Sequence, residues 1–323
     1  MISIIIFFET AFSQADATRF LDTFFTPSDT FSKPRFYAVV GTEAVLYTSA
    51  TIMLYQYWYK DYPLTNFHFF DDNGEWLQYD KFGHLYTAYF ETNITTGFYK
   101  WAGMKPAKAY WAGALTGSIL QLTIEVFDGF SEKWGFSLGD FAMNTLGAGI
   151  STGQNYLWDE QRMRIKFSSH FTDYSGYDTI VQNRVQSLFG SSSAEKVLKD
   201  YNGQTTWLSL NPSMFMKDDT PFPKWLMLSA GYSVEGLLGG YENKWCPDPN
   251  MKPEDCPPEL LIDYSNIERN RQFYLSVDVD FSQIKTKSEF INALFGVVNI
   301  VKVPAPALEF SGKGTVTFKP LYF

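Results

Sequence analysis

The hydrophobic periodicity of the 323-residue chain changes near Trp158, and this change limits its fold more than any other feature. Between about residue 36 and residue 160, apolar stretches recur at lengths suited to helices. From residue 161 onward, apolar residues alternate with polar ones, which is the two-residue period of a β-strand. The sequence therefore predicts an α+β fold, in which an N-terminal helical bundle over about residues 36–160 precedes an antiparallel β-rich domain over residues 161–323.

The first half of the chain contains three long apolar stretches without a charged residue. They run from Ala44 to Tyr59, from Ala109 to Ile124 and from Phe141 to Trp158, which is 16, 16 and 18 residues. A helix that crosses a bilayer needs about 20 residues, so we expect a buried or half-immersed bundle rather than separate transmembrane helices. Small residues such as Gly113 and Gly147 favour close packing between these helices.

The second half contains short segments in which apolar and polar residues alternate. The clearest segment places five apolar residues on one face, namely Phe273, Leu275, Val277, Val279 and Phe281. The opposite face carries Ser276, Asp278 and Asp280, and we expect this face to contact water. Strands of about ten residues with aromatic ends fit a small outer-membrane-type barrel. An antiparallel β-sheet packed on the helices fits the same pattern, so both alternatives stay open.

The N-terminal region predicts export of the chain. Ile2–Phe8 is apolar, and Ala11 and Ser13 are small residues at the positions that a signal peptidase recognises. We therefore expect a signal segment over residues 1–14. Residues 15–35 are polar and rich in turn-forming residues, which predicts a linker.

The two cysteines of the chain also bear on its compartment. Cys246 and Cys256 flank a proline-containing loop whose ends could meet, so we expect a disulfide between them. A disulfide fits the oxidising space outside the cytoplasm. The alternative is a pair of free thiols in a surface loop.

Composition and motifs exclude several classes of protein. The net charge is −9 and no cluster of Lys and Arg is present, which argues against nucleic acid as a partner. Aromatic residues make up 18% of the chain, which argues against disorder. The sequence lacks the short motifs of serine hydrolases, zinc proteases, P-loop proteins and dinucleotide-binding enzymes. None of these enzyme classes is therefore supported.

Three pairs of polar residues lie within the mostly apolar helical half. The members of each pair are four residues apart and would share one face of a helix: Asp80 with His84, Gln121 with Glu125, and Asp140 with Asn144. Burying unpaired carboxylates costs several kcal/mol, so these groups must meet one another, a cation or water. The pattern predicts one polar pocket inside the bundle.

Two interpretations of this pocket remain open. Asp80, His84, Glu125 and Asp140 could hold a divalent metal ion through carboxylate oxygens and an imidazole nitrogen, or could relay a proton. Alternatively, the polar groups form a buried network that sets the register of the helices, with Asp140 serving only as part of a helix cap. The spacing alone does not distinguish a catalytic or binding pocket from a structural one.

The motifs around these pairs resemble a known family. Asp80-Lys-Phe-Gly-His84, Ile124-Glu-Val-Phe-Asp-Gly129 and Ser137-Leu-Gly-Asp140-Phe-Ala-Met-Asn144 are similar to motifs of the YfiM-like family of uncharacterised bacterial envelope proteins, in particular its long members from Bacteroidota. The same elements are more remotely similar to those of VanZ-like membrane proteins, which are associated with resistance to glycopeptide antibiotics. The resemblance implies a shared polar pocket and carries over no established activity.

These features lead to an expected function and a set of alternatives. We expect an exported protein of the outer membrane or of the periplasm-facing cell envelope. It would bind the head group of a membrane lipid or an envelope glycan, or serve as an accessory subunit beside other outer-membrane proteins. A hydrolase or transferase that acts on such a head group, with Asp80 and His84 as an acid/base pair, is the alternative. A transport barrel is the third and least favoured expectation.

Overall fold

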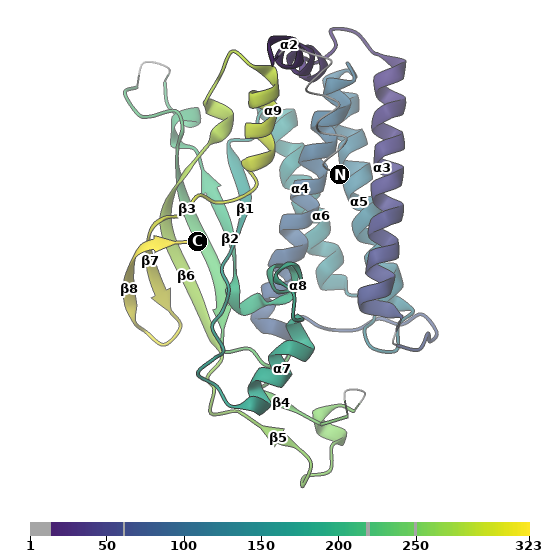
Figure 1. Cartoon of the computed structure of the whole chain (residues 1–323), viewed down its shortest axis with the longest axis vertical. Coiled ribbons are helices and arrows are strands. Elements are labelled where there is room, and N and C mark those ends of the chain that lie inside the picture. Colours follow the sequence, from purple (N-terminus) through teal and green to yellow (C-terminus); the bar gives the residue numbers. More distant parts are fainter. Residues whose placement is uncertain (1–13, 61, 218–219, 249–250) are drawn as a thin grey trace.

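The computed structural model describes residues 14–60, 62–217, 220–248 and 251–323. The predicted signal segment over residues 1–14 lies outside the described residues, except for its last residue. Figure 1 shows a bundle of long helices on one side of the molecule and a curved sheet on the other. The predicted α+β class is confirmed, with helices first and an antiparallel sheet after them.

The N-terminal half consists of long helices that run side by side in Figure 1. Their bounds are α3 Lys33–Leu54, α4 Tyr79–Trp101, α5 Pro106–Gly129 and α6 Leu138–Trp158. The shorter helix α2, Gln14–Phe25, lies across the top of the bundle in Figure 1. A π-helical turn, Tyr55–Tyr59, continues α3, and a 3₁₀ turn, Glu75–Gln78, precedes α4. α4 is the central helix, because it packs against both α5 and α6 and also contacts the sheet.

The helices are longer than the uncharged stretches that predict them. α5 has 24 residues and α6 has 21, because the buried residues Glu125 and Asp140 extend these helices beyond their apolar stretches. Among the described residues, the segment Lys33–Tyr57 is long and apolar enough to cross a membrane, as judged by length and composition.

Part of the predicted linker is a helix. The polar and turn-forming residues of 15–35 predict a linker, but residues 15–25 belong to α2 and residues 33–35 begin α3. The ring of Phe24 contacts Trp101 at 5.1 Å between centroids, and the ring of Phe25 contacts Phe290 at 5.3 Å. Both partners lie far along the chain, so tertiary packing that local composition does not reveal stabilises this helix.

Glycines allow the central helices to approach closely, as the small residues of the sequence predicted. A Cβ atom added at Gly147 of α6 would lie 2.3 Å from the carbonyl oxygen of Leu85 in α4. A Cβ added at Gly113 of α5 would lie 2.1 Å from the Thr96 hydroxyl, also in α4. By contrast, a Cβ at Gly149 would meet no atom within 4 Å.

This difference predicts opposite effects for two alanine substitutions in the same helix. Gly147→Ala should lower the free energy of unfolding by about 1–3 kcal/mol, because the helix backbones must move apart. Gly149→Ala should leave stability unchanged or raise it by up to about 1 kcal/mol, because alanine favours the helix. Denaturant unfolding of the two purified variants in detergent measures both effects. Equal stability of the two variants would contradict the close approach of α4 and α6.

The C-terminal half contains a six-stranded antiparallel sheet with the order β1-β2-β3-β6-β7-β8. The strands are β1 Met163–Ser169, β2 Gln204–Leu210, β3 Leu226–Glu235, β6 Asn270–Val279, β7 Ala305–Ser311 and β8 Val316–Tyr322. β1 and β8 are its edges, so the described residues form an open sheet rather than a closed barrel. A contact across the concave side shows that the sheet curls strongly. Lys166 of β1 reaches Asp278 of β6, with 2.9 Å between Nζ and Oδ2.

The environment of the polar face of β6 differs from the prediction. The alternation of the strand is as expected, but Phe273, Leu275 and Val277 are 50%, 53% and 40% exposed. Asp278 and Asp280 are 2% and 0% exposed. The prediction that these aspartates contact water is wrong. Periodicity shows which residues share a face, whereas burial of the aspartates depends on cationic partners from β1.

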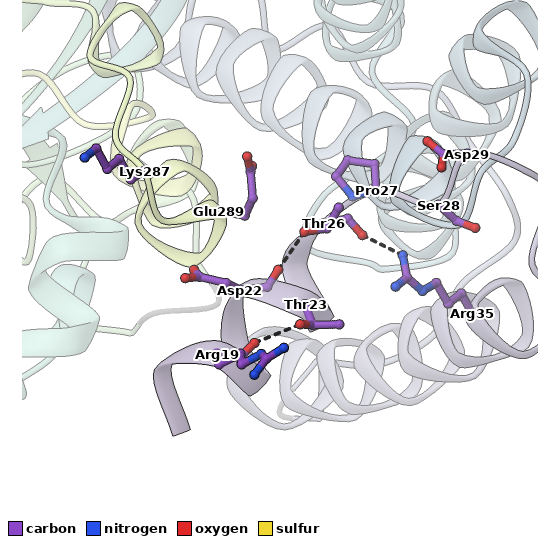
Figure 2. A pocket seen from close by; sticks show the side chains of 10 residues that line it. All are labelled: Arg19, Asp22, Thr23, Thr26, Pro27, Ser28, Asp29, Arg35, Lys287 and Glu289. Atoms are coloured by element: carbon purple, nitrogen blue, oxygen red, sulfur yellow. Dashed lines mark hydrogen bonds between the residues drawn. The ribbon is translucent and has the colours of Figure 1, made fainter. Parts of the chain in front are cut away.

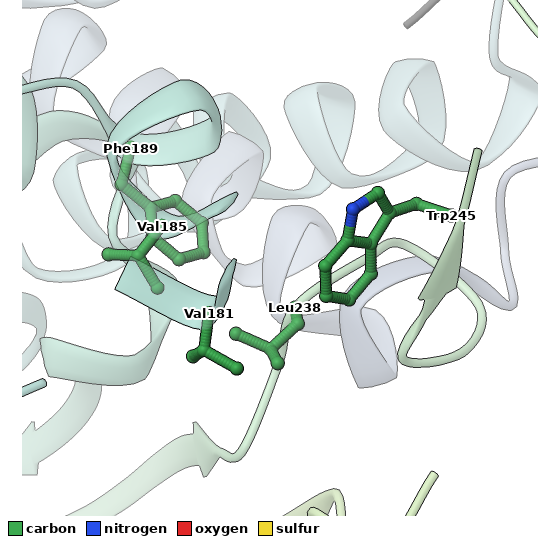
Figure 3. Close-up of a cluster of buried hydrophobic side chains, with 5 residues drawn as sticks. All are labelled: Val181, Val185, Phe189, Leu238 and Trp245. Atoms are coloured by element: carbon green, nitrogen blue, oxygen red, sulfur yellow. The ribbon is translucent and has the colours of Figure 1, made fainter. Parts of the chain in front are cut away.

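Shorter elements accompany the sheet. Toward its lower end in Figure 1 lie α7 Thr179–Phe189, α8 Ser193–Lys199, and a two-stranded sheet of β4 Lys244–Trp245 and β5 Ile262–Asp263. Near its upper end lies α9 Glu289–Val298. Figure 3 shows the small apolar core of this region, in which Val181, Val185 and Phe189 of α7 lie near Leu238 and Trp245. The loop after β4 is closed by a disulfide between Cys246 and Cys256, as expected.

Candidate functional site

The structure brings five of the six predicted pocket residues together. Asp80 and His84 lie in the first turns of α4, Glu125 in the last turns of α5, and Asp140 and Asn144 in the first turns of α6. His84 Nδ1 lies 3.1 Å from Asn144 Oδ1 and 3.5 Å from Glu125 Oε1. His84 Nε2 lies 3.7 Å from Asp140 Oδ1. Three helices therefore contribute to one cluster.

The sixth predicted residue, Gln121, lies outside this cluster. Its side-chain amide donates a hydrogen bond of 2.8 Å to Glu91 Oε2 in α4. Gln121 lies about one helical turn from Glu125, and it is 1% exposed. It therefore satisfies a neighbouring buried carboxyl group rather than the cluster around His84.

Local capping positions the acids of α6. Ser137 precedes the helix, and its hydroxyl accepts a hydrogen bond of 3.0 Å from the backbone N–H of Asp140. The backbone N–H of Ser137 donates to Glu125 Oε2 at 3.3 Å. The start of α6 is thereby tied to the end of α5, which holds Glu125 near Nδ1 of His84 and Asp140 near its Nε2.

Lys81 is a pocket residue that the spacing of the polar pairs does not predict. Its ammonium lies 2.6 Å from Asp72, 2.8 Å from Asp140 and 3.5 Å from Asp80. Lys81 is 5% exposed. Its position beside Asp80 was the available sequence signal, but a lysine next to an acid is usually solvated, and only the packing of α4 against α6 buries it.

Two acids from the segment before α4 complete the site. The Ser137 hydroxyl donates a hydrogen bond of 2.6 Å to Asp72. Burial would raise the pKa of Asp72, but hydrogen bonds from Lys81 and Ser137 outweigh burial and lower it below the ordinary value. Burial, together with the nearby carboxylates of Asp80 and Asp72, raises the pKa of Glu75 to about 7. No spacing in the sequence connects these loop residues to the three pairs.

The sheet half also contacts the cluster through Tyr201, which follows α8 and lies in a 3₁₀ turn. Its hydroxyl donates a hydrogen bond of 2.8 Å to Asp80 Oδ1. On the other side of the bundle, the Tyr59 hydroxyl donates to Asp128 at 2.7 Å. The polar region thus extends from the end of α3 to the sheet and joins the two halves of the molecule.

The cluster can hold a divalent cation. One carboxylate oxygen each from Asp80 and Asp140 and one ring nitrogen of His84 lie within 4.8 Å of one another. Two oxygens and one imidazole nitrogen suit Zn²⁺ or Mn²⁺. A proton on His84 Nδ1 fits the contact with Asn144 Oδ1 and leaves Nε2 on the side of Asp140. Asn144 and Glu125 would then orient the imidazole from behind, as is common for metal-bound histidines.

The charge balance of the cluster is compatible with a cation. Six carboxylic acids surround two basic side chains, Lys81 and His84; the acids are Asp72, Glu75, Asp80, Glu125, Asp128 and Asp140. A cation near Asp140 would compete with the Lys81 ammonium. That ammonium could keep its contact of 2.6 Å with Asp72. The residues therefore fit a divalent cation, on the condition that Lys81 moves away from Asp140.

Two cavities of the described residues lie away from this cluster. One, of about 870 Å³, lies between α2 and the segment that begins α9, and Figure 2 shows that it is lined by charged residues such as Arg19, Arg35 and Glu289. The other, of about 540 Å³, is lined by residues at one end of the sheet, including His170 and Glu309. No predicted pocket residue lines either cavity.

Comparison with known proteins bears on the helical half. Residues 68–155 match the family model described as "Predicted periplasmic lipoprotein (DUF2279)". The matched stretch contains α4, α5 and nearly all of α6, and therefore all six predicted pocket residues. Searches of curated proteins and of solved structures give no match.

The family match supports an envelope protein that faces the periplasm. This agrees with the compartment expected from the N-terminal segment and the cysteines. The similarity to YfiM-like and VanZ-like proteins stays a prediction, as does the outer membrane as the particular location.

Proposed function

We propose that this protein is an outer-membrane-associated envelope protein that binds the head group of a lipid or glycan through a divalent cation at Asp80, His84 and Asp140. The observation that carries the proposal is the convergence of these three ligands, from two helices, within 4.8 Å. Separating the outer membrane from the inner membrane on a density gradient tests the location.

The excess of acidic side chains explains why a cation must bind before the head group does. Phosphate or carboxylate groups of a head group would be repelled by a cluster in which carboxylates outnumber basic side chains. A bound cation reverses the local charge and offers coordination positions, because three protein ligands leave at least one position open on Zn²⁺. The side chains of Asp80 and His84 are 23% and 18% exposed, so a ligand can reach this side of the cluster.

Cation binding is the expected outcome that tests this function. Wild-type protein should bind Zn²⁺ or Mn²⁺, measured by titration calorimetry in detergent. Asp140→Asn removes a charged ligand and should weaken binding by more than about 100-fold, whereas Asn144→Ala removes an orienting group and should weaken it by about 10–100-fold. Glu91→Gln changes a carboxyl group that contacts Gln121 outside the ligand set, so its affinity should match the wild type.

Two results would contradict the proposal. One is the absence of measurable binding to the wild-type protein with either cation. The other is an equal affinity of wild type and Asp140→Asn, which would place any bound cation elsewhere. In the latter case the cluster would be the structural network that the sequence left open as an alternative.

The second candidate function is a hydrolase or transferase that acts on the same head group. The contacts of His84 favour it, because a histidine held through Nδ1 by Asn144, with Nε2 facing Asp140 at 3.7 Å, has the arrangement of an acid/base group. Mass spectrometry of envelope lipids after incubation with the protein separates the two candidates. Unchanged lipids that stay bound support the binding protein, and loss of head groups supports the enzyme.

A further inference from the structure

The sheet buries charged and polar residues in its interior, beside the rings of Trp207 and Tyr274, and exposes apolar residues on its outer face. On β6, Phe273, Leu275 and Val277 point away from the concave side, while Tyr274, Ser276 and Asp278 are at most 9% exposed. Neighbouring strands follow the same rule, with exposed apolar residues at Leu208, Leu228, Leu308, Phe310 and Phe318. In a water-soluble sheet the buried face is the apolar one. This sheet therefore presents an apolar surface to its surroundings.

The helices are arranged in the same inverted way. The outer side of α5 carries a stripe of exposed apolar residues, namely Trp111, Leu115, Ile119 and Leu122. Its inner side contains the buried Gln121 and Glu125. The outer side of α6 is similar, with Phe141, Leu146 and Leu157 exposed, and only 6% of the most apolar window of α3 is buried. A surface helix of a soluble protein has the opposite arrangement.

Charged residues are confined to the ends of these elements or to the interior. Between Lys108 and Asp128, the only charged residue of α5 is Glu125, which is 1% exposed. α6 has none from Phe141 to Trp158. The apolar outer surface is therefore a band with charged residues at its borders, as in proteins that cross a bilayer.

The height of this band matches a bilayer. With 24 and 21 residues, α5 and α6 are about 36 and 32 Å long at about 1.5 Å per residue. The strands β3 and β6 have 10 residues each, and a tilted transmembrane strand needs about 9–11 residues to cross a hydrocarbon core of about 30 Å.

We propose that the helical bundle and the sheet together are embedded in a lipid bilayer, with acyl chains covering the outer faces of α3, α5, α6 and the sheet. Figure 1 places α3 and the sheet on opposite sides of the molecule, so a single partner protein could not cover both, whereas a bilayer surrounds them. The buried ion pairs of Lys166 with Asp278 and of Arg164 with Asp280 meet the requirement that charged groups inside a lipid-embedded protein find partners within it. Edge strand β1 also has backbone partners on its outer side: the Phe167 N–H donates to the carbonyl oxygen of Ile300, and the Phe167 carbonyl oxygen accepts from the Lys302 N–H.

Nitroxide accessibility tests the proposal on the full chain in vesicles of phosphatidylethanolamine and phosphatidylglycerol. Cysteines are introduced one at a time as Leu115→Cys on α5, Leu275→Cys on β6 and Ser187→Cys on α7. Cys246 and Cys256 are joined to each other, so the introduced thiol reacts with the spin label. Ser187 is exposed on α7, which is not one of the apolar elements proposed to face lipid, so it is the control.

The labels at positions 115 and 275 should collide severalfold more often with oxygen, which concentrates in lipid, than with a water-soluble nickel chelate. The label at position 187 should show the reverse. The proposal would be overturned if the nickel chelate reached position 115 or position 275 as readily as position 187, or if the protein did not sediment with the vesicles. Low access of both oxygen and the nickel chelate to the labels at positions 115 and 275 would also overturn it, because a second copy of the chain would then cover the band.

Discussion

Replacing Asp278 with alanine should lower the free energy of unfolding by about 3–5 kcal/mol, since it leaves buried cations without their partner. Asp278 and Lys166 have no exposed side-chain surface and form an ion pair of 2.9 Å. Asp278 also accepts hydrogen bonds from the Ser209 hydroxyl at 3.1 Å and from the Val303 backbone at 3.1 Å. Denaturant unfolding in detergent, followed by circular dichroism, measures the loss.

The control variants separate the charge effect from the loss of packing. Val277→Ala, on the outer face of the same strand, should cost less than about 1.5 kcal/mol in detergent, because micelle rather than protein surrounds Val277. The double variant Lys166→Met with Asp278→Leu should recover most of the stability, since it removes both charges together. A cost for Asp278→Ala as small as that for Val277→Ala would show that the interior is wet rather than closed.

Replacing Lys81 with methionine should have a comparably large effect on the helical half, and a divalent cation should reverse it. Without a cation, the variant should lose about 3–5 kcal/mol, since three carboxylates lose the ammonium that neutralises them. The same change removes the competitor for the cation, so Zn²⁺ or Mn²⁺ should bind more tightly than to the wild type. At a cation concentration of 100 times the dissociation constant, binding would restore about 2.7 kcal/mol.

Lys100→Met is the matched control, because Lys100 also lies in α4 and also pairs with an aspartate, Asp159. That pair is partly exposed, so its loss should cost less than about 1 kcal/mol, and added cation should not change it. Thermal unfolding with and without cation compares the variants. If the cation stabilises Lys81→Met no more than Lys100→Met, the cluster around Lys81 is not a cation site.

The local pattern of the chain was sufficient to predict its long helices and the main strands of its sheet. Helix and strand periods depend on neighbouring residues only, so the change near Trp158 correctly divides the molecule into a bundle and an antiparallel sheet. Helix α8, Ser193–Lys199, begins after a capping box formed by Ser192 and Glu195, which is a local signal of the same kind. The helices α2, α7 and α9 were not predicted, and the aromatic residues of α2 find their partners far along the chain.

The candidate site was predictable in part for the same reason. Residues four apart share a helix face, so the pairs of Asp80 with His84 and of Asp140 with Asn144 could be recognised before their helices were placed. Lys81 and Asp72 could not be assigned to the site, because their roles come from contacts between α4, α6 and the loop before α4. Gln121 has the right spacing but contacts Glu91, since it lies on the turn of α5 farther from the cluster.

The sequence by itself therefore determined the order of helical bundle and sheet, the residues that share each face, and the polar pairs within the apolar helices. Only the tertiary structure decided which face is inside. The alternation of β6 is equally compatible with Phe273 or Asp278 in the interior, and the ion pair with Lys166 places Asp278 there. The physical reason is that periodicity is a property of one segment, whereas burial depends on partners from other segments and on the surrounding medium.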